Sequence, residues 1–135
     1  MDSPWHILVV EDTLIAQVFI KQQLLKHGCV VDTANDGEAA IRKTLFTPYD
    51  VILMDIGLGV GPDGFTVAAE IKKQSRINRT TPIMAVSAHG EPEYHEKAIT
   101  VGMLAYFYKP FTPQDATTLV DYLKKTRRKS SLPVG

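Results

Sequence analysis

Five short apolar runs recur at fairly even intervals along the chain and predict five buried β-strands. The runs are rich in β-branched and aromatic residues, and most of them are continuous rather than alternating. A strand that is apolar on both faces is buried on both faces, which is typical of a parallel sheet covered by helices. The predicted strands cover residues 7–10, 29–31, 51–54, 83–86 and 104–108.

The segments between these runs have helical patterning and recognisable ends. Gly28 favours a left-handed stop for the first helix, and Pro48 prevents the second from continuing. Thr112 followed by Pro113 is the clearest helix start in the chain, because threonine caps and proline fits the first helical position. The helices are expected over residues 14–27, 36–46, 65–74, from 92 to before 102, and from 113 to about 125.

Five repeats of a strand followed by a helix predict an α/β fold with a doubly wound, five-stranded parallel sheet. Each connection is long enough for a right-handed crossover. The periodicity does not give the order of the strands. Ligand sites in sheets of this kind lie at the carboxyl ends of the strands, so the residues there are the candidates for function.

Composition narrows the class of protein. A chain of 135 residues fits one domain, and 15 basic residues balance 15 acidic ones, which excludes a strongly basic surface over the whole domain. The single cysteine, Cys29, excludes an internal disulfide and a cysteine-rich zinc site. No apolar run approaches the ~18 residues of a membrane span, and no secretory leader is apparent. We therefore expect a cytoplasmic domain without membrane contact.

Three acids follow two of the predicted strands. Glu11 and Asp12 come directly after the first strand, and Asp55 directly after the third. Carboxylates that converge on one sheet edge repel one another unless a cation lies among them, and Mg²⁺ prefers such oxygen ligands. The alternative is that each acid only caps a helix or a loop.

The remaining strand ends supply matching chemistry. The fourth strand is followed by Ser87, a hydroxyl, and the fifth by Lys109, an ammonium. A phosphoryl group on a carboxylate needs cations to neutralise its oxygens and a hydroxyl to donate a hydrogen bond. Aspartate is itself a phosphoryl-accepting nucleophile, so these residues together indicate a site for an aspartyl phosphate.

At these residues the chain resembles the response-regulator receiver domain of two-component and phosphorelay signalling. Its signals occur in order from about residue 6 to 125: Glu11-Asp12, Asp55, Ser87-Ala88, Tyr106 and Lys109-Pro110. The resemblance implies a (βα)5 flavodoxin-like fold with sheet order 2-1-3-4-5. It also implies a receiver domain over residues 1–126 and a short basic and polar tail over residues 127–135.

The resemblance assigns roles to the site residues. It implies that Asp55 accepts phosphate from a phosphohistidine on a histidine kinase or a histidine-phosphotransfer domain. Mg²⁺ would be held by Asp12, Asp55 and the Gly57 carbonyl directly, and by Glu11 mostly through water. The domain would catalyse only its own phosphorylation and dephosphorylation, and would not be an enzyme that turns over a substrate.

The same resemblance implies a conformational switch. Lys109 would pair with a phosphoryl oxygen, Ser87 would move toward the phosphoryl group, and Tyr106 would rotate into the space vacated. The Lys109–Pro110 peptide bond is expected to be cis. The loop over residues 56–64 departs from the usual pattern by one extra residue and a lost proline, and its glycines predict mobility without metal.

The first helix has more apolar residues than one core face needs. Ala16, Phe19, Ile20 and Leu24 are expected to face the sheet, which leaves a second apolar set for a phosphodonor to dock against. A broader buried stripe is the alternative interpretation. The predicted docking residues are Leu14, Ile15 and Val18, with Leu25 nearby.

Other interpretations remain open. A haloacid-dehalogenase-like phosphatase also uses a strand-end aspartate with Mg²⁺, but needs a second aspartate where this chain has Gly57. A flavodoxin-like FMN-binding domain would have a phosphate loop where this chain has Glu11 and Asp12. The basic residues 124–129 are interpreted as a solvated helix end, and we do not expect direct nucleic-acid binding. The chain is either a stand-alone regulator or the receiver of a hybrid sensor kinase.

Overall fold

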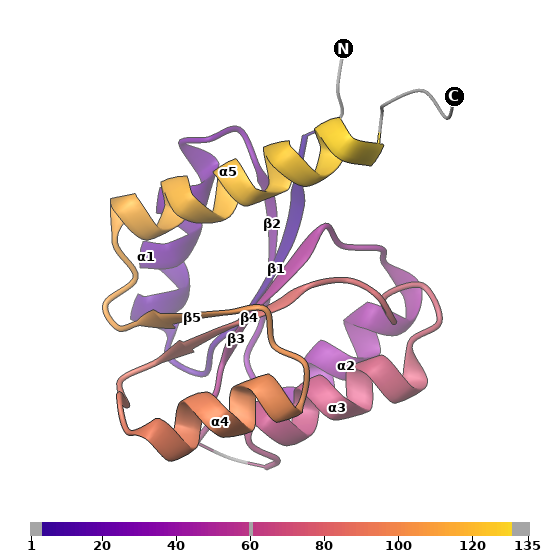
Figure 1. Ribbon diagram of the computed structural model, residues 1–135, viewed down its shortest axis with the longest axis vertical. Coiled ribbons are helices and arrows are strands. Elements are labelled where there is room, and N and C mark those ends of the chain that lie inside the picture. The colour runs from indigo at the N-terminus through magenta and orange to yellow at the C-terminus, as the bar shows by residue number, and fades with distance from the viewer. Residues whose placement is uncertain (1–3, 60, 131–135) are drawn as a thin grey trace.

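The computed structural model describes residues 4–59 and 61–130, which form one parallel sheet between two layers of helices (Figure 1). The strand order is β2-β1-β3-β4-β5, which confirms the predicted order. Each connection between strands carries a helix. The strands are β1 (His6–Val10), β2 (Val30–Ala34), β3 (Val51–Asp55), β4 (Ile83–Ser87) and β5 (Ala105–Tyr108).

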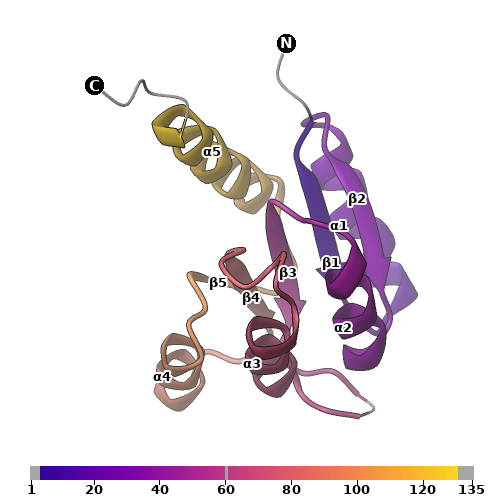
Figure 2. The ribbon, with the colours of Figure 1, turned by 90° about the vertical axis from the view of Figure 1, so that its right-hand side faces the viewer.

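Two helices cover one face of the sheet and three cover the other, as Figures 1 and 2 show from two directions. The first layer consists of α1 (Leu14–Leu25) and α5 (Pro113–Ser130). The second layer consists of α2 (Gly37–Phe46), α3 (Gly64–Gln74) and α4 (Pro92–Thr100). Among the described residues, none of these helices combines the length and the apolarity that a membrane crossing requires.

The central strand β3 is buried along its whole length, as its continuous apolar run predicts. Successive side chains of a strand point to opposite faces, so β3 contributes to both cores. Leu53 packs in the core under α1 and α5, whereas Ile52 and Met54 pack in the core under α2, α3 and α4. Burial of apolar surface on both faces therefore fixes the position of Asp55, the last residue of this strand.

Several element boundaries differ from the sequence prediction. The second strand was predicted over residues 29–31, but β2 runs from Val30 to Ala34 and includes two polar residues. This is possible because β2 is an edge strand, where Asp32 is only half-buried and accepts a hydrogen bond from the Tyr49 hydroxyl at 2.8 Å. The third and fourth strands each extend one residue further than predicted, and so include Asp55 and Ser87.

The ends of two helices also differ. The first helix stops at Leu25, two residues early, and the chain then turns through Gly28 with φ +78°. The last helix continues to Ser130 rather than ending near residue 125, so the first part of the predicted tail is helical. Arg127 stacks on the ring of Trp5 at 3.3 Å, which gives this end of α5 a contact with the rest of the domain. The tail residues 131–135 lie outside the described residues.

Candidate functional site at the carboxyl edge of the sheet

The three predicted acids meet at one edge of the sheet. Strands β1 and β3 are neighbours in parallel register, so Glu11 and Asp55 leave the sheet side by side. One carboxylate oxygen from each of Glu11, Asp12 and Asp55 lies within 4.8 Å of the others. The structure therefore brings together the residues that the sequence separates by more than forty positions.

The capping alternative does not account for this arrangement. The N-cap of α1 is Thr13 rather than an acid. Glu11 Oε1 accepts only the backbone N–H of Thr13, at 3.2 Å, and Asp55 Oδ1 accepts that of Gly57, at 2.9 Å. Each of these two carboxylates still has an oxygen directed to the shared site, because their second oxygens both contact Lys109.

Lys109 is the cation that the sequence places after the last strand. Its Nζ donates a hydrogen bond to Asp55 Oδ2 at 2.9 Å. The same Nζ lies 3.1 Å from Glu11 Oε2, an ion pair that lacks hydrogen-bond geometry. Glu11 Oε2 is thus a buried carboxylate oxygen whose charge Lys109 compensates but which, among the described residues, accepts no well-aligned hydrogen bond. A further cation would complete its surroundings.

The electrostatics of the site follow from this crowding. Burial, together with the neighbouring Asp55 carboxylate, raises the pKa of Glu11 to about 7, against the opposing effect of Lys109. Burial alone would lower the pKa of Lys109, but Asp55 and Glu11 more than offset this and raise it. Glu11 and Asp55 share one ammonium and Asp12 lies beside them, so the donor set fits a divalent cation held by oxygen ligands. Glu11, Asp12 and Asp55 are the residues that would hold it.

Gly57 lies beside Asp55, as predicted, and its N–H contacts the carboxylate. Metal binding by the Gly57 carbonyl stays a prediction. Gly59 in the same loop donates its N–H to Asp12 Oδ2 at 3.0 Å, a contact that the sequence analysis did not identify. The predicted mobility of this loop also stays a prediction, and Val60 lies outside the described residues.

Ser87 and Tyr106 lie near the same edge. The Ser87 hydroxyl is buried and accepts the N–H of His89 at 2.9 Å. Tyr106 is half-buried, and its hydroxyl donates a hydrogen bond to the His89 carbonyl at 2.8 Å. Its ring stacks on His95 of α4, with ring centroids 4.0 Å apart. This contact of His95 was not predicted from the sequence.

The segment after β5 borders the site. The Lys109–Pro110 peptide bond is cis, as predicted. The backbone N–H of Lys109 donates to the Ser87 carbonyl at 2.8 Å, which joins this segment to the end of β4. Pro110 and Phe111 then form one wall of a groove, whose other wall is the first half of α1.

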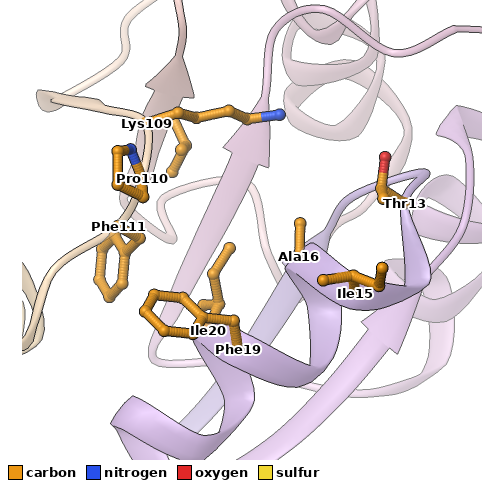
Figure 3. Close-up of a pocket in the computed structure, with 9 residues that line it drawn as sticks. Thr13, Ile15, Ala16, Phe19, Ile20, Lys109, Pro110 and Phe111 are labelled. Carbon is orange, nitrogen blue, oxygen red and sulfur yellow. The ribbon is translucent and has the colours of Figure 1, made fainter.

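This groove has a volume of about 540 Å³ and an apolar lining (Figure 3). Figure 3 shows Phe19 reaching from α1 toward Phe111, with the Lys109 ammonium at the mouth of the groove. The expectation that Phe19 packs against the sheet is wrong, because its side chain is 42% exposed. It lines the groove instead, while Gln17 and Gln23 occupy buried positions of the helix.

The predicted docking residues face outward. Leu14, Ile15 and Val18 are 71%, 81% and 45% exposed, so a broader buried stripe does not describe them. With Phe19 and Gln22 they line a second shallow hollow on the same side of α1. Their role in docking stays a prediction.

Gln17 is a buried polar residue next to the site that was not predicted from the sequence. Its amide contacts the backbone of Glu11 and the side chain of Asn35. A signal was present in the sequence: Gln17 shares the helical spacing of Ile20 and Leu24, the two apolar residues of α1 that are buried in the core. A glutamine at an inward position indicates a hydrogen-bonding role.

Comparisons with known proteins agree with this geometry. A family model described as the response regulator receiver domain matches residues 7–121. Probable histidine kinase 2 of Oryza sativa subsp. indica is 34% identical over 120 residues, which cover 78% of this chain and 11% of that protein. Transcriptional regulatory protein ResD of Bacillus subtilis (strain 168) is 31% identical over 125 residues, which cover 93% of this chain and 50% of ResD. The chain thus spans half or less of the length of both relatives.

A solved structure is similar over nearly the whole chain. It is the receiver domain of sensor histidine kinase PA1611 from Pseudomonas aeruginosa PAO1, which is described with a magnesium ion coordinated in the active site cleft. The two chains are 32% identical, with a TM-score of 0.77, over 91% of this chain and 97% of that one. Neither the phosphatase nor the FMN-binding alternative receives support from these similarities.

Proposed function

Since the chain belongs to the response regulator receiver domain family of two-component signalling, we propose that Asp55 accepts a phosphoryl group from a phosphohistidine. The donor would be a histidine kinase or a histidine-phosphotransfer domain. Asp55 supports this role because it is buried, ends the central strand and lies among two further acids and Lys109. This convergence is the observation that carries the proposal.

The transfer step balances without a further reactant. An oxygen of the Asp55 carboxylate forms a bond to phosphorus, the bond from phosphorus to the histidine nitrogen breaks, and that nitrogen keeps the electron pair. The product is an acyl phosphate. A bound Mg²⁺ at Glu11, Asp12 and Asp55 supplies charge neutralisation for the transferred group.

The chain's own residues support the same step. The Lys109 ammonium, already 2.9 Å from Asp55, can neutralise a phosphoryl oxygen as the carboxylate loses its charge. Ser87 carries a buried hydroxyl at the end of the adjacent strand β4. Because the acceptor is consumed in each transfer, we propose self-catalysed phosphorylation and dephosphorylation rather than turnover of a substrate.

The exposed apolar residues of α1 border the site and support docking of the phosphodonor there. Leu14, Ile15 and Val18 continue the apolar groove that ends at Lys109. The relatives include a histidine kinase and a transcriptional regulator, and this chain spans only part of each.

The test is chemical modification with acetyl phosphate and Mg²⁺, read by the mass of the intact protein. The wild-type chain should gain one phosphoryl group, and Asp55→Asn should gain none. Asp36→Asn is a matched control, because Asp36 is an exposed N-cap of α2 and asparagine caps equally well. Labelling of Asp55→Asn at the wild-type rate would overturn the proposal.

A further inference from the structure

We propose that Gln17 is a positioning residue that holds the β1–α1 loop so that Glu11 and Asp12 stay in place for the metal. The inference rests on the proposed function of the acidic site. Gln17 acts through its contact with the Glu11 backbone, and Asn35 in the loop after β2 accepts a second hydrogen bond from the same Gln17 amide. Neither residue has a carboxylate or belongs to the acidic cluster itself.

Two short hydrogen bonds define the arrangement. The side-chain Nε2 of Gln17 donates to the backbone carbonyl of Glu11 at 2.6 Å. The same nitrogen donates to Asn35 Oδ1, also at 2.6 Å. A backbone carbonyl can only accept, so the first contact fixes which atom of the amide is the nitrogen. Both N–H groups of the amide are thereby used, and the side chain is only 6% exposed.

These bonds complete the support of the Glu11 backbone. Its N–H donates to the carbonyl of Ala34, the last residue of β2, at 3.0 Å. Its carbonyl accepts from Gln17, so both polar backbone groups of Glu11 have fixed partners. The peptide unit that leads into Asp12 is consequently held in one orientation. Only residues 11–13 connect β1 to α1, so little chain is available to relax.

A reason for such support lies in the repulsion within the site. The carboxylates of Glu11, Asp12 and Asp55 repel one another before a cation binds. Without a fixed backbone, the loop can relieve this repulsion by moving Glu11 and Asp12 away. Residues that fix metal ligands from outside typically contribute about 10–100-fold to metal affinity. The amide of Gln17 is placed to do this.

Packing alone does not explain a glutamine at this position. An apolar side chain of the same length would fill the space, whereas a buried amide is unfavourable unless its hydrogen bonds are made. Gln23 offers a contrast on the same helix. It is buried to a similar degree but lies six residues further along the helix, ~9 Å from Gln17 along the helix axis and in the direction away from the β1–α1 loop.

The experiment compares Gln17→Met with Gln23→Met. Each change removes one buried amide of α1 and keeps the length of the side chain. The Mg²⁺ dissociation constant is measured by competition with Mn²⁺, which is followed by electron paramagnetic resonance, and unfolding is measured separately in EDTA. We expect Gln17→Met to weaken Mg²⁺ binding about tenfold and Gln23→Met to change it less than twofold.

Equal Mg²⁺ affinities for Gln17→Met and the wild type, or equal losses in both variants, would overturn the inference. If Gln17→Met does not fold, Asn35→Ala decides in the same way, because Asn35 is exposed and its loss frees the Gln17 amide. A failure of the proposed function is distinguishable, since the wild type would then bind no Mg²⁺ and gain no phosphoryl group. If only the Gln17 inference fails, wild-type binding and labelling persist.

Discussion

Lys109 reaches from the end of β5 to the end of the central strand and places its ammonium 2.9 Å from Asp55 Oδ2. Strand β4 separates these two strands in the sheet, so the contact spans the carboxyl edge. The same ammonium lies 3.1 Å from Glu11, and it is therefore shared by two buried acids. Loss of this cation would leave both acids uncompensated.

We predict that Lys109→Ala lowers the free energy of unfolding by about 2 kcal/mol in EDTA, because a buried charge without its partner is strongly unfavourable. Excess Mg²⁺ should recover part of this loss. Asp55 should remain modifiable by acetyl phosphate, while the response of Tyr106 to the modification is lost. Urea unfolding with and without Mg²⁺ measures the first effect.

Lys97→Ala is the matched control for Lys109→Ala. The Lys97 ammonium lies 5.1 Å from the centre of the Phe65 ring and away from the acids, so its loss should cost less than about 1 kcal/mol. Equal destabilisation by the two variants in EDTA would show that Lys109 does not compensate the buried acids.

Mg²⁺ affinity should fall as the pH is lowered from 8 to 6. The raised pKa of Glu11, about 7, means that this acid is mostly a carboxylate at pH 8 and mostly protonated at pH 6. A protonated acid does not attract a cation, so the dissociation constant should rise below pH 7, by up to about tenfold per pH unit. Titrations with Mg²⁺ at three pH values test this. Glu11→Gln should bind more weakly and lose the dependence over this range.

Two glycines beside the site should respond differently to alanine. A Cβ at Gly59 would lie 2.7 Å from Asp12 Oδ2, the end of an exposed side chain that can turn away. A Cβ at Gly64 would lie 2.5 Å from the Asp55 carbonyl oxygen and 2.6 Å from Ile56 Cα, both backbone atoms. We expect Gly64→Ala to lower the free energy of unfolding by about 3 kcal/mol and Gly59→Ala by less than about 0.5 kcal/mol.

Gly59→Ala should instead weaken Mg²⁺ binding several-fold, on the order of the effect of other residues that orient metal ligands. The reason is that Asp12 must leave its present position and loses the hydrogen bond from the Gly59 N–H. Urea unfolding and Mg²⁺ titration of both variants separate the two effects. Unchanged Mg²⁺ affinity in Gly59→Ala would mean that the position of Asp12 does not limit binding.

Polar substitutions on the exposed face of α1 should slow phosphoryl transfer only when the donor is a protein. Ile15→Gln and Val18→Gln should reduce the rate of transfer from a phosphorylated histidine-phosphotransfer domain about fivefold or more, as for central interface residues. Labelling by acetyl phosphate should not change, because these side chains lie outside the acidic cluster. Ile99→Gln on α4 is the control, since Ile99 is 75% exposed and as apolar as Ile15. An equal reduction in Ile99→Gln would place donor docking elsewhere.

The local pattern of apolar and polar residues was sufficient to predict most of the fold and the acids at the ends of the strands. Val51 to Met54 is apolar on both faces, which predicts a strand covered by helices on both sides, and Asp55 follows it directly. The edge strand β2 was harder to predict, because Asp32 and Thr33 are polar and their burial depends on neighbouring residues. Sequence patterning shows what a strand buries, but not which strand lies at an edge.

Contacts between separate loops could not be predicted from the sequence. The Gln17 amide is explained only when Asn35, eighteen positions away, is beside it. Phe19 has the helical spacing of a core residue, yet it lines a groove because the segment 109–111 is on its other side. Both features depend on where a distant loop is placed, and a single sequence carries no signal for that.

The Tyr106 side chain contacts two histidine residues, one through its hydroxyl and the other through its ring. Its hydroxyl donates to the His89 carbonyl, and its face stacks on His95, whose Nε2 lies 2.8 Å from the Tyr108 hydroxyl. Any inward turn of Tyr106 must break both contacts together. It would also expose the imidazole ring of His95 on α4. A chemical change at the buried acids would therefore alter the aromatic surface on the exposed side of α4.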